Sequence, residues 1–135
     1  MRRAVVSRLL AMVLVLFPAA ALCGGPVRID VLYMNHGPLL STLQDVKSVL
    51  AKYGPRVTVA WHDFESDEGR AFMKQKNVSS HVPLMIWMND AFRQRVEGKD
   101  VAFTGFPTGS GPAFFQGKWT IGDLRKALDQ LVSKK

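Results

Sequence analysis

The hydrophobic positions that follow residue 26 change from a strand pattern to a helix pattern. Val27 to Met34 (VRIDVLYM) is short and rich in branched and aromatic side chains, which predicts a β-strand. From Leu39 to Tyr53 the apolar side chains recur at helical spacing, with polar residues between them. Gly54-Pro55 should end this helix, because glycine accepts a left-handed exit and proline cannot continue a helix.

A second set of alternating elements follows. Arg56 to Trp61 (RVTVAW) predicts another strand, and Ser66, followed by two acidic residues, predicts the N-cap of a helix that runs to about Lys76. Leu84 to Met88 (LMIWM) is a short apolar run consistent with a buried strand. After a polar excursion, Val101 to Phe106 (VAFTGF) is predicted to be the antiparallel partner of that strand.

The last predicted element is an amphipathic helix. Thr120 and Asp123 resemble a capping box with Asp in place of Glu, and the apolar residues that follow keep helical spacing up to Leu131. Strands joined through a helix pair in parallel with a right-handed crossover, and a short connection makes the last two strands antiparallel. The sequence therefore predicts an α/β fold: a βαβ unit, a helix, a ββ hairpin and a C-terminal helix. Its mixed sheet should carry helices on both faces.

The first 23 residues have the pattern of an export signal. Arg2, Arg3 and Arg8 precede an apolar run from Leu9 to Leu22 that ends in small residues. This run is shorter than the roughly 20 residues that a membrane span needs. We therefore expect a signal peptide over residues 1–23 and one exported domain over residues 24–135, located in the periplasm or secreted.

The position where this signal ends is open between three alternatives. The signal can end after Ala19-Ala20-Ala21 or after Ala21-Leu22-Cys23, since both have small residues at the required places. In the third alternative Cys23 is the lipidated N-terminus of a bacterial lipoprotein, although that pattern usually has a small residue where Leu22 stands. We expect membrane attachment only in this third case.

Charge and cysteine content narrow the classes of function that the domain can have. The formal net charge of the whole chain is +7, but three of the basic residues lie in the signal and the rest are scattered. A modest, scattered charge does not indicate a nucleic-acid partner. Cys23 is the only cysteine, so the predicted domain has no internal disulfide and no cysteine-based metal cage. We expect the domain to be a monomer.

Two motifs resemble those of the thioredoxin-fold superfamily. That family has a strand, then Cys-Gly-Pro-Cys at the start of a helix, and later a proline that is preceded by a β-branched residue and followed by an apolar strand. The corresponding stretches here are His36-Gly37-Pro38-Leu39 and Val82-Pro83-Leu84. The resemblance implies a thioredoxin-like fold and a cis bond before Pro83. Because His36 and Leu39 replace both redox cysteines, thiol–disulfide exchange is not expected.

The resemblance also implies where this protein binds. The loop at Val82-Pro83 would lie beside His36, Gly37 and Pro38, and Val82 would offer backbone groups to an extended peptide. We therefore expect a non-catalytic module that binds an unidentified protein or peptide. Phe114 and Phe115 lie in a long loop rich in Gly and Pro, which either plugs the vacated dithiol site as added core or forms a contact patch. The plug is the favoured of these two alternatives.

Histidines provide an alternative function, and no cofactor is otherwise expected. His36 and His81 should approach each other in the inferred fold and can bind copper or zinc, with a thioether from Met34 or Met88. Their spacing does not match a recognised metal motif, so polar loop residues are the default interpretation. His62 can form an orienting pair with the adjacent Asp63, but no nucleophile accompanies it, and an enzyme is the least favoured class.

Overall fold

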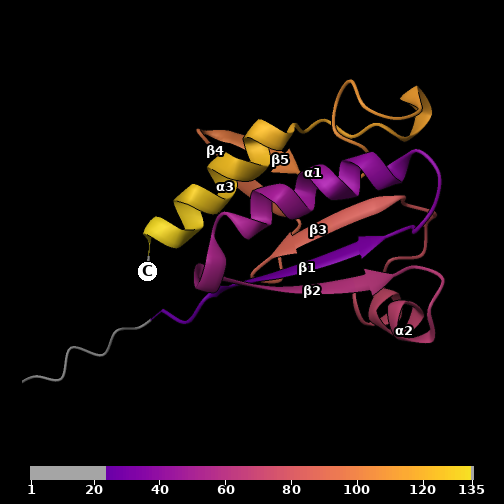
Figure 1. Ribbon diagram of the computed structural model, residues 1–135, viewed down its shortest axis with the longest axis horizontal. Helices are drawn as coiled ribbons and strands as arrows, with labels where there is room; N and C mark the ends of the chain where they lie inside the picture. Colours follow the sequence, from indigo (N-terminus) through magenta and orange to yellow (C-terminus); the bar gives the residue numbers. More distant parts are fainter. Residues whose placement is uncertain (1–23, 135) are drawn as a thin grey trace, which may run out of the picture.

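The computed structural model describes residues 24–134, so the predicted signal peptide lies outside the described residues. The helices and strands follow one another in an order that alternates at first and ends in a helix (Figure 1). They are β1 (Val27–Tyr33), α1 (Leu39–Ala51), the 3₁₀ turn η1 (Gly54–Arg56), β2 (Val57–Asp63), α2 (Asp67–Gln75), β3 (Leu84–Met88), β4 (Arg93–Val96), β5 (Lys99–Ala102), the 3₁₀ turn η2 (Ala113–Phe115) and α3 (Ile121–Ser133).

The main sheet is mixed, as predicted. Its strand order is β2-β1-β3, in which β1 is parallel to β2 and antiparallel to β3. The chain joins β1 to β2 through α1, which is the connection that a parallel pair requires. The α/β class and the mixed sheet are therefore confirmed.

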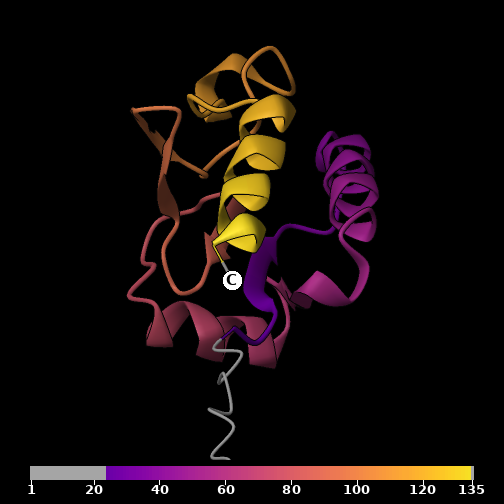
Figure 2. The same cartoon turned by 90° about the vertical axis from the view of Figure 1, so that its left-hand side faces the viewer.

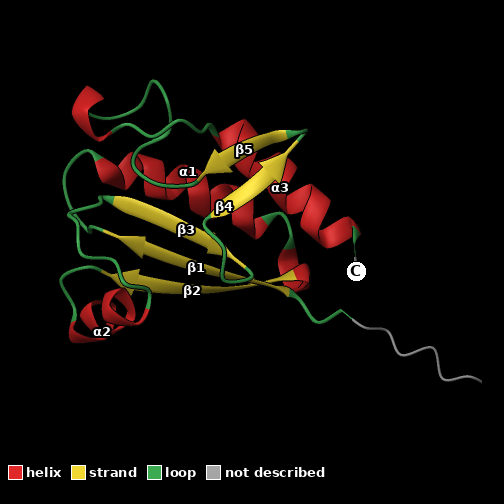
Figure 3. Cartoon of the chain, turned by 180° about the vertical axis from the view of Figure 1, so that it is seen from behind, coloured by secondary structure: helices red, strands yellow, loops and turns green. Residues whose placement is uncertain are grey.

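The predicted partner of β3 is present but shorter than expected. The backbone N–H of Ile86 donates to the Phe103 carbonyl at 3.0 Å, and the N–H of Gly105 donates to the Leu84 carbonyl at 2.8 Å. Residues 99–102 belong instead to β5, which pairs with β4 in a separate hairpin that the sequence interpretation missed. This hairpin lies beside α3 (Figure 3). Lys126 of α3 reaches its turn, with the Lys126 Nζ 2.7 Å from Glu97 Oε2.

Helices cover both faces of the sheet, as predicted (Figures 1 and 2). Successive side chains of a strand point to opposite faces, so Ile29 and Val31 join the apolar cluster that packs against α1 and α3. Leu32 and Trp87 point the other way and pack with Phe72 of α2. Burial on both faces holds the ends of the strands in place, and the loops that leave these ends therefore have fixed starting points.

Two helix starts confirm their predicted caps. The Ser66 hydroxyl accepts from the N–H of Gly69 at 2.8 Å at the start of α2. At α3 the Thr120 hydroxyl accepts from the N–H of Asp123 at 3.0 Å, and the Asp123 carboxylate accepts from the Thr120 N–H at 2.9 Å. This reciprocal pair is a capping box with aspartate in the glutamate position.

The prediction of a cis bond before Pro83 is wrong. No peptide bond between residues 24 and 134 is cis, so Val82 and Pro83 are joined in trans. The Pro83 carbonyl accepts from the N–H of Met34 at 3.0 Å, which continues the β1–β3 pairing one residue past the ladder. The trans form is also the intrinsically favoured one, by about 0.5–1 kcal/mol for an X–Pro bond.

Candidate functional site

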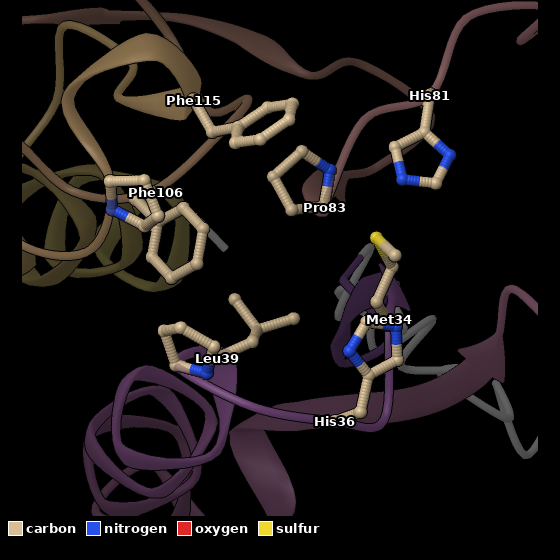
Figure 4. A pocket seen from close by; sticks show the side chains of 9 residues that line it. Met34, His36, Leu39, His81, Pro83, Phe106 and Phe115 are labelled. Atoms are coloured by element: carbon tan, nitrogen blue, oxygen red, sulfur yellow. The ribbon is translucent and has the colours of Figure 1, made fainter.

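An apolar pocket lies where three loops meet at one end of the sheet. Its cavity volume is about 170 Å³, and among the described residues that line it only two histidines have polar side chains (Figure 4). The loops come from the end of β1, from the approach to β3 and from the long segment before α3. The lining residues are Met34, His36, Pro38, Leu39, His81, Pro83, Phe106, Pro112 and Phe115.

The pairing of β1 with β3 brings the first two loops together. Tyr33 lies opposite Leu84 in the antiparallel ladder, and the bond between Met34 and Pro83 follows it. Continuing this register by two more residues would place His36 opposite His81, and both do line the pocket. We predicted that His36, Gly37 and Pro38 lie beside the Val82-Pro83 loop. The pairing of β1 with β3 is the feature that brings these two loops to the same end of the sheet.

The loop before α3 folds back on itself to form the opposite wall. The N–H of Phe106 donates to the Phe115 carbonyl at 2.9 Å, and the N–H of Gly117 donates to the Phe106 carbonyl at 2.7 Å. The buried Trp119 indole donates to the Gly105 carbonyl at 3.2 Å. Gly105 itself has φ +77°, and a Cβ there would lie 2.5 Å from the Phe115 carbonyl oxygen. This close approach requires glycine.

The favoured expectation that Phe114 and Phe115 plug the site is wrong. Phe114 is 91% exposed and Phe115 is 37% exposed, so neither belongs to the core. Phe115 lines the pocket, and Phe114 stands edge-on to it with ring centroids 5.2 Å apart. The backbone hydrogen bonds within the loop hold Phe115 beside Phe106. The rings of Phe114 and Phe115 therefore stay at the rim of the pocket.

The backbone of Val82, like that of Ser79, Ser80 and His81 before it, has no hydrogen-bond partner among the described residues. The Val82 side chain is half-buried among the residues that pack against Leu32 and Trp87. Backbone groups of this kind normally have a partner in protein or water. Their position beside Pro83 puts this hydrogen-bonding capacity next to the pocket.

The two pocket histidines also adjoin the loop that follows β2. His36 Nε2 lies 3.9 Å from Glu65 Oε1, and its side chain is 55% exposed. The His81 ring packs edge-on against Phe64, with centroids 5.3 Å apart. Residues 24–134 contain no group of three or more His, Cys, Asp or Glu that could hold a metal ion. Any metal site here would need a donor of another kind.

The two methionines that were considered as metal ligands lie in different places. Met34 lines the pocket together with both histidines. Met88 is fully buried and pairs with Ile29, at the end of β3 away from Leu84. The structure therefore leaves Met34 as the thioether near the histidines.

The sequence interpretation missed a second polar cluster, on the α2 face of the sheet. His62 Nδ1 lies 2.6 Å from Glu68 Oε1, and its Nε2 lies 3.0 Å from Asp30 Oδ1. The ring stacks on Phe72 with centroids 3.7 Å apart. The predicted pairing with Asp63 is wrong, because both ring nitrogens face these other two carboxylates. The sequence held one signal of this cluster: Asp30 is an acidic residue within the mostly apolar strand Val27–Tyr33.

Comparison with known proteins did not identify a family. No protein-family model matches the chain, and a search of the curated proteins found no match. Within residues 24–134 there is also no helix with the length and apolar character of a membrane span. The fold and the site define the chain as a mixed α/β protein with an apolar, histidine-rimmed pocket at the end of its sheet.

Proposed function

We propose that this protein is a thioredoxin-like, non-catalytic module that binds an extended segment of another protein through the pocket. Its family assignment rests on the motifs His36-Gly37-Pro38-Leu39 and Val82-Pro83-Leu84. The mixed sheet with helices on both faces is compatible with that assignment. The chemistry of the family is not proposed, because thiolate attack on a disulfide requires sulfur and the residues at the motif offer none.

The observation that carries the proposal is the apolar pocket itself. Its volume of about 170 Å³ is close to the roughly 150 Å³ of an apolar cavity that holds benzene. One leucine or phenylalanine side chain of a partner would therefore fill it. Burying such a side chain contributes about 1.5–3 kcal/mol, which is enough to select apolar residues at one position of a peptide.

The backbone of Val82 supports an extended conformation of the bound segment. An added strand takes its affinity from main-chain hydrogen bonds and its specificity from pockets for alternate side chains. Val82 offers an N–H and a carbonyl without partners among the described residues, directly beside the pocket. Phe114, which is almost fully exposed, extends the apolar contact beyond the cavity.

The place of action that we propose is the periplasm or the medium. This rests on the signal pattern of residues 1–23, with anchorage through a lipidated Cys23 as the alternative. Mass spectrometry of the N-terminal peptide of the exported protein distinguishes the three ends of the signal. An N-terminus that still begins at Met1 on the exported protein would contradict the prediction of a cleaved signal.

A peptide library displayed on phage tests the binding proposal. We expect selection of peptides with one large apolar residue, and calorimetry should then show weaker binding by the Phe115→Ala variant. Val82→Pro removes the N–H and should weaken binding, whereas Val82→Ala shortens the side chain, keeps the N–H and should bind as tightly as wild type.

Circular dichroism checks that each variant is folded. A library that yields no binder, or binders that the folded Val82→Pro and Phe115→Ala variants hold as tightly as wild type, would refute the proposal.

A further inference from the structure

Three side chains with metal-binding atoms stand along one side of the pocket. They are the imidazoles of His36 and His81 and the thioether of Met34 (Figure 4). In this view the Met34 sulfur points between the two rings. Peptide binding through apolar contacts and backbone groups does not explain why the polar side chains among the described lining residues are both histidines.

The local geometry favours convergence of these donors. The bond between the Met34 N–H and the Pro83 carbonyl fixes the two chain segments side by side, and His36 and His81, which lie just beyond it, both line the pocket. Met34 is 8% exposed, so its sulfur belongs to the wall of the pocket and not to a mobile surface side chain. The donors therefore come from two chain segments that the sheet already holds together.

The histidines have nitrogen atoms available for a metal. His81 makes ring contacts with Phe64 and Phe115 but has no hydrogen bond within residues 24–134. His36 has Nε2 near the Glu65 carboxylate, at 3.9 Å. Ligating histidines commonly direct their second nitrogen to a carboxylate, which sets the orientation of the ring. Glu65 is placed for that supporting role.

The donor set discriminates between metals. Zinc sites in proteins take three or four ligands from cysteine, histidine and carboxylate, and the described residues provide no group of three such side chains. A thioether is a soft ligand that selects Cu(I), and imidazole also suits copper. Two imidazoles and one thioether are thus a better match for Cu(I) than for zinc.

We propose that Met34, His36 and His81 form a Cu(I) site at the mouth of the pocket. This site does not depend on the proposed peptide binding, because it uses the polar side of the pocket. The two activities can be separated by substitution: Met34→Leu keeps an apolar wall of similar volume but removes the sulfur. Phe115→Ala removes peptide contact area and leaves all three donors in place.

Anaerobic competition against a chromophoric Cu(I) chelator tests the site in the full chain. Cys23→Ser is included in every sample, because a thiol would bind Cu(I) by itself. We expect one Cu(I) per chain. Met34→Leu, His36→Gln and His81→Gln should each lower the affinity by roughly tenfold or more, since even outer partners of metal ligands are worth roughly 10- to 100-fold. Met73→Leu, the same change on α2, is the matched control and should have no effect.

X-ray absorption of the copper-loaded protein gives a second readout that does not depend on the stability of a variant. One sulfur and two nitrogen neighbours are expected, and in the Cys23→Ser background this sulfur can come only from methionine. A Cys23→Ser chain with no further substitution that does not compete for Cu(I), equal affinities of Met34→Leu and Met73→Leu, or a copper spectrum without sulfur would overturn the proposal. Tighter binding of Zn(II) than of Cu(I) would also overturn it.

Discussion

Cysteines introduced by His36→Cys and Leu39→Cys would test whether these positions correspond to the redox pair of the thioredoxin family. The two residues flank Gly37-Pro38 directly before and at the start of α1. A helix N-terminus lowers the pKa of a thiol, which favours the reactive thiolate. We expect the double variant, in a Cys23→Ser background, to form an internal disulfide and to catalyse thiol–disulfide exchange.

The expected stabilities follow from the burial of the two side chains. Leu39 is 2% exposed, and because Leu→Ala in a core costs about 2–5 kcal/mol, Leu39→Cys should cost about 2 kcal/mol. His36 has a side chain that is 55% exposed, so its replacement should cost little. A disulfide that closes a loop of about four residues contributes about 2 kcal/mol in the chain-entropy treatment.

The oxidised double variant should therefore be about as stable as wild type, and its reduced form about 2 kcal/mol less stable. For a domain of this size that difference corresponds to a separation of about 8 °C in Tm. Thermal melts with and without reductant measure it, and an insulin reduction assay measures the activity. Leu39→Cys alone is the control, since it has the packing loss without the disulfide.

Two results would refute this reasoning. If no internal disulfide forms in an oxidising glutathione buffer, residues 36 and 39 are not juxtaposed as in a dithiol protein. If a disulfide forms but the reduced and oxidised forms have the same Tm, the disulfide does not stabilise the folded state as the chain-entropy treatment predicts. Wild type itself should not reduce insulin above background.

Two further predictions concern groups outside the pocket. Burial, together with a hydrogen bond to a carboxylate of α3, raises the pKa of Tyr53 to about 12. The folded state therefore holds this proton more tightly than the unfolded chain does, so the associated stability is present below pH ~10 and is lost as the pH rises through ~12. Tyrosinate absorbance of a Tyr33→Phe variant should show a midpoint near pH 12, and a midpoint near ~10 would contradict the burial argument. Asp30→Ala should lower the free energy of unfolding by about 2–3 kcal/mol in urea titrations, because it leaves a buried nitrogen of His62 without its partner. Glu68→Ala, at a carboxylate that is 66% exposed, should cost below about 1 kcal/mol, and equal costs would refute the distinction.

Local sequence signals were sufficient for most of the main elements. The positions of α1 and α3 follow from apolar spacing, and the first helix ends before Gly54, which has φ +52° as a left-handed exit requires. Ser66 and Thr120 cap their helices through side-chain bonds within three residues. Such features depend on neighbours in the sequence and can therefore be predicted without knowledge of the fold.

The β4–β5 hairpin had no comparable signal. Its strands are four residues each and mostly exposed, so the alternation of apolar and polar residues that marks a half-buried strand is weak. Its turn is made by Glu97 and Gly98, both with positive φ, where Asn-Gly or Asp-Gly is the usual sequence. Contact with α3, including the ion pair of Glu97 with Lys126, accompanies these strands and supplies what local propensity lacks.

The candidate site was predictable as far as strand register could be inferred. Once Val27–Tyr33 and Leu84–Met88 are paired, the loops with His36 and His81 must leave the same end of the sheet. The exposure of Phe114 was not predictable, because it depends on how the loop before α3 folds back on itself. The cluster around His62 was missed because its three polar residues come from β1, β2 and α2.

Polar groups with and without hydrogen-bond partners lie in different parts of this molecule. Among the described residues, no buried side-chain nitrogen or oxygen lacks a hydrogen-bond partner, and both ring nitrogens of His62 face carboxylates. That cluster is complete and joins β1, β2 and α2, so its role is to hold the fold together. At the pocket, by contrast, the backbone of Val82 and the ring of His81 have no hydrogen bond within residues 24–134, beside the exposed Phe114. Polar groups without partners and an exposed aromatic ring thus lie together at one end of the sheet. A peptide or a metal ion bound at that end would contact them.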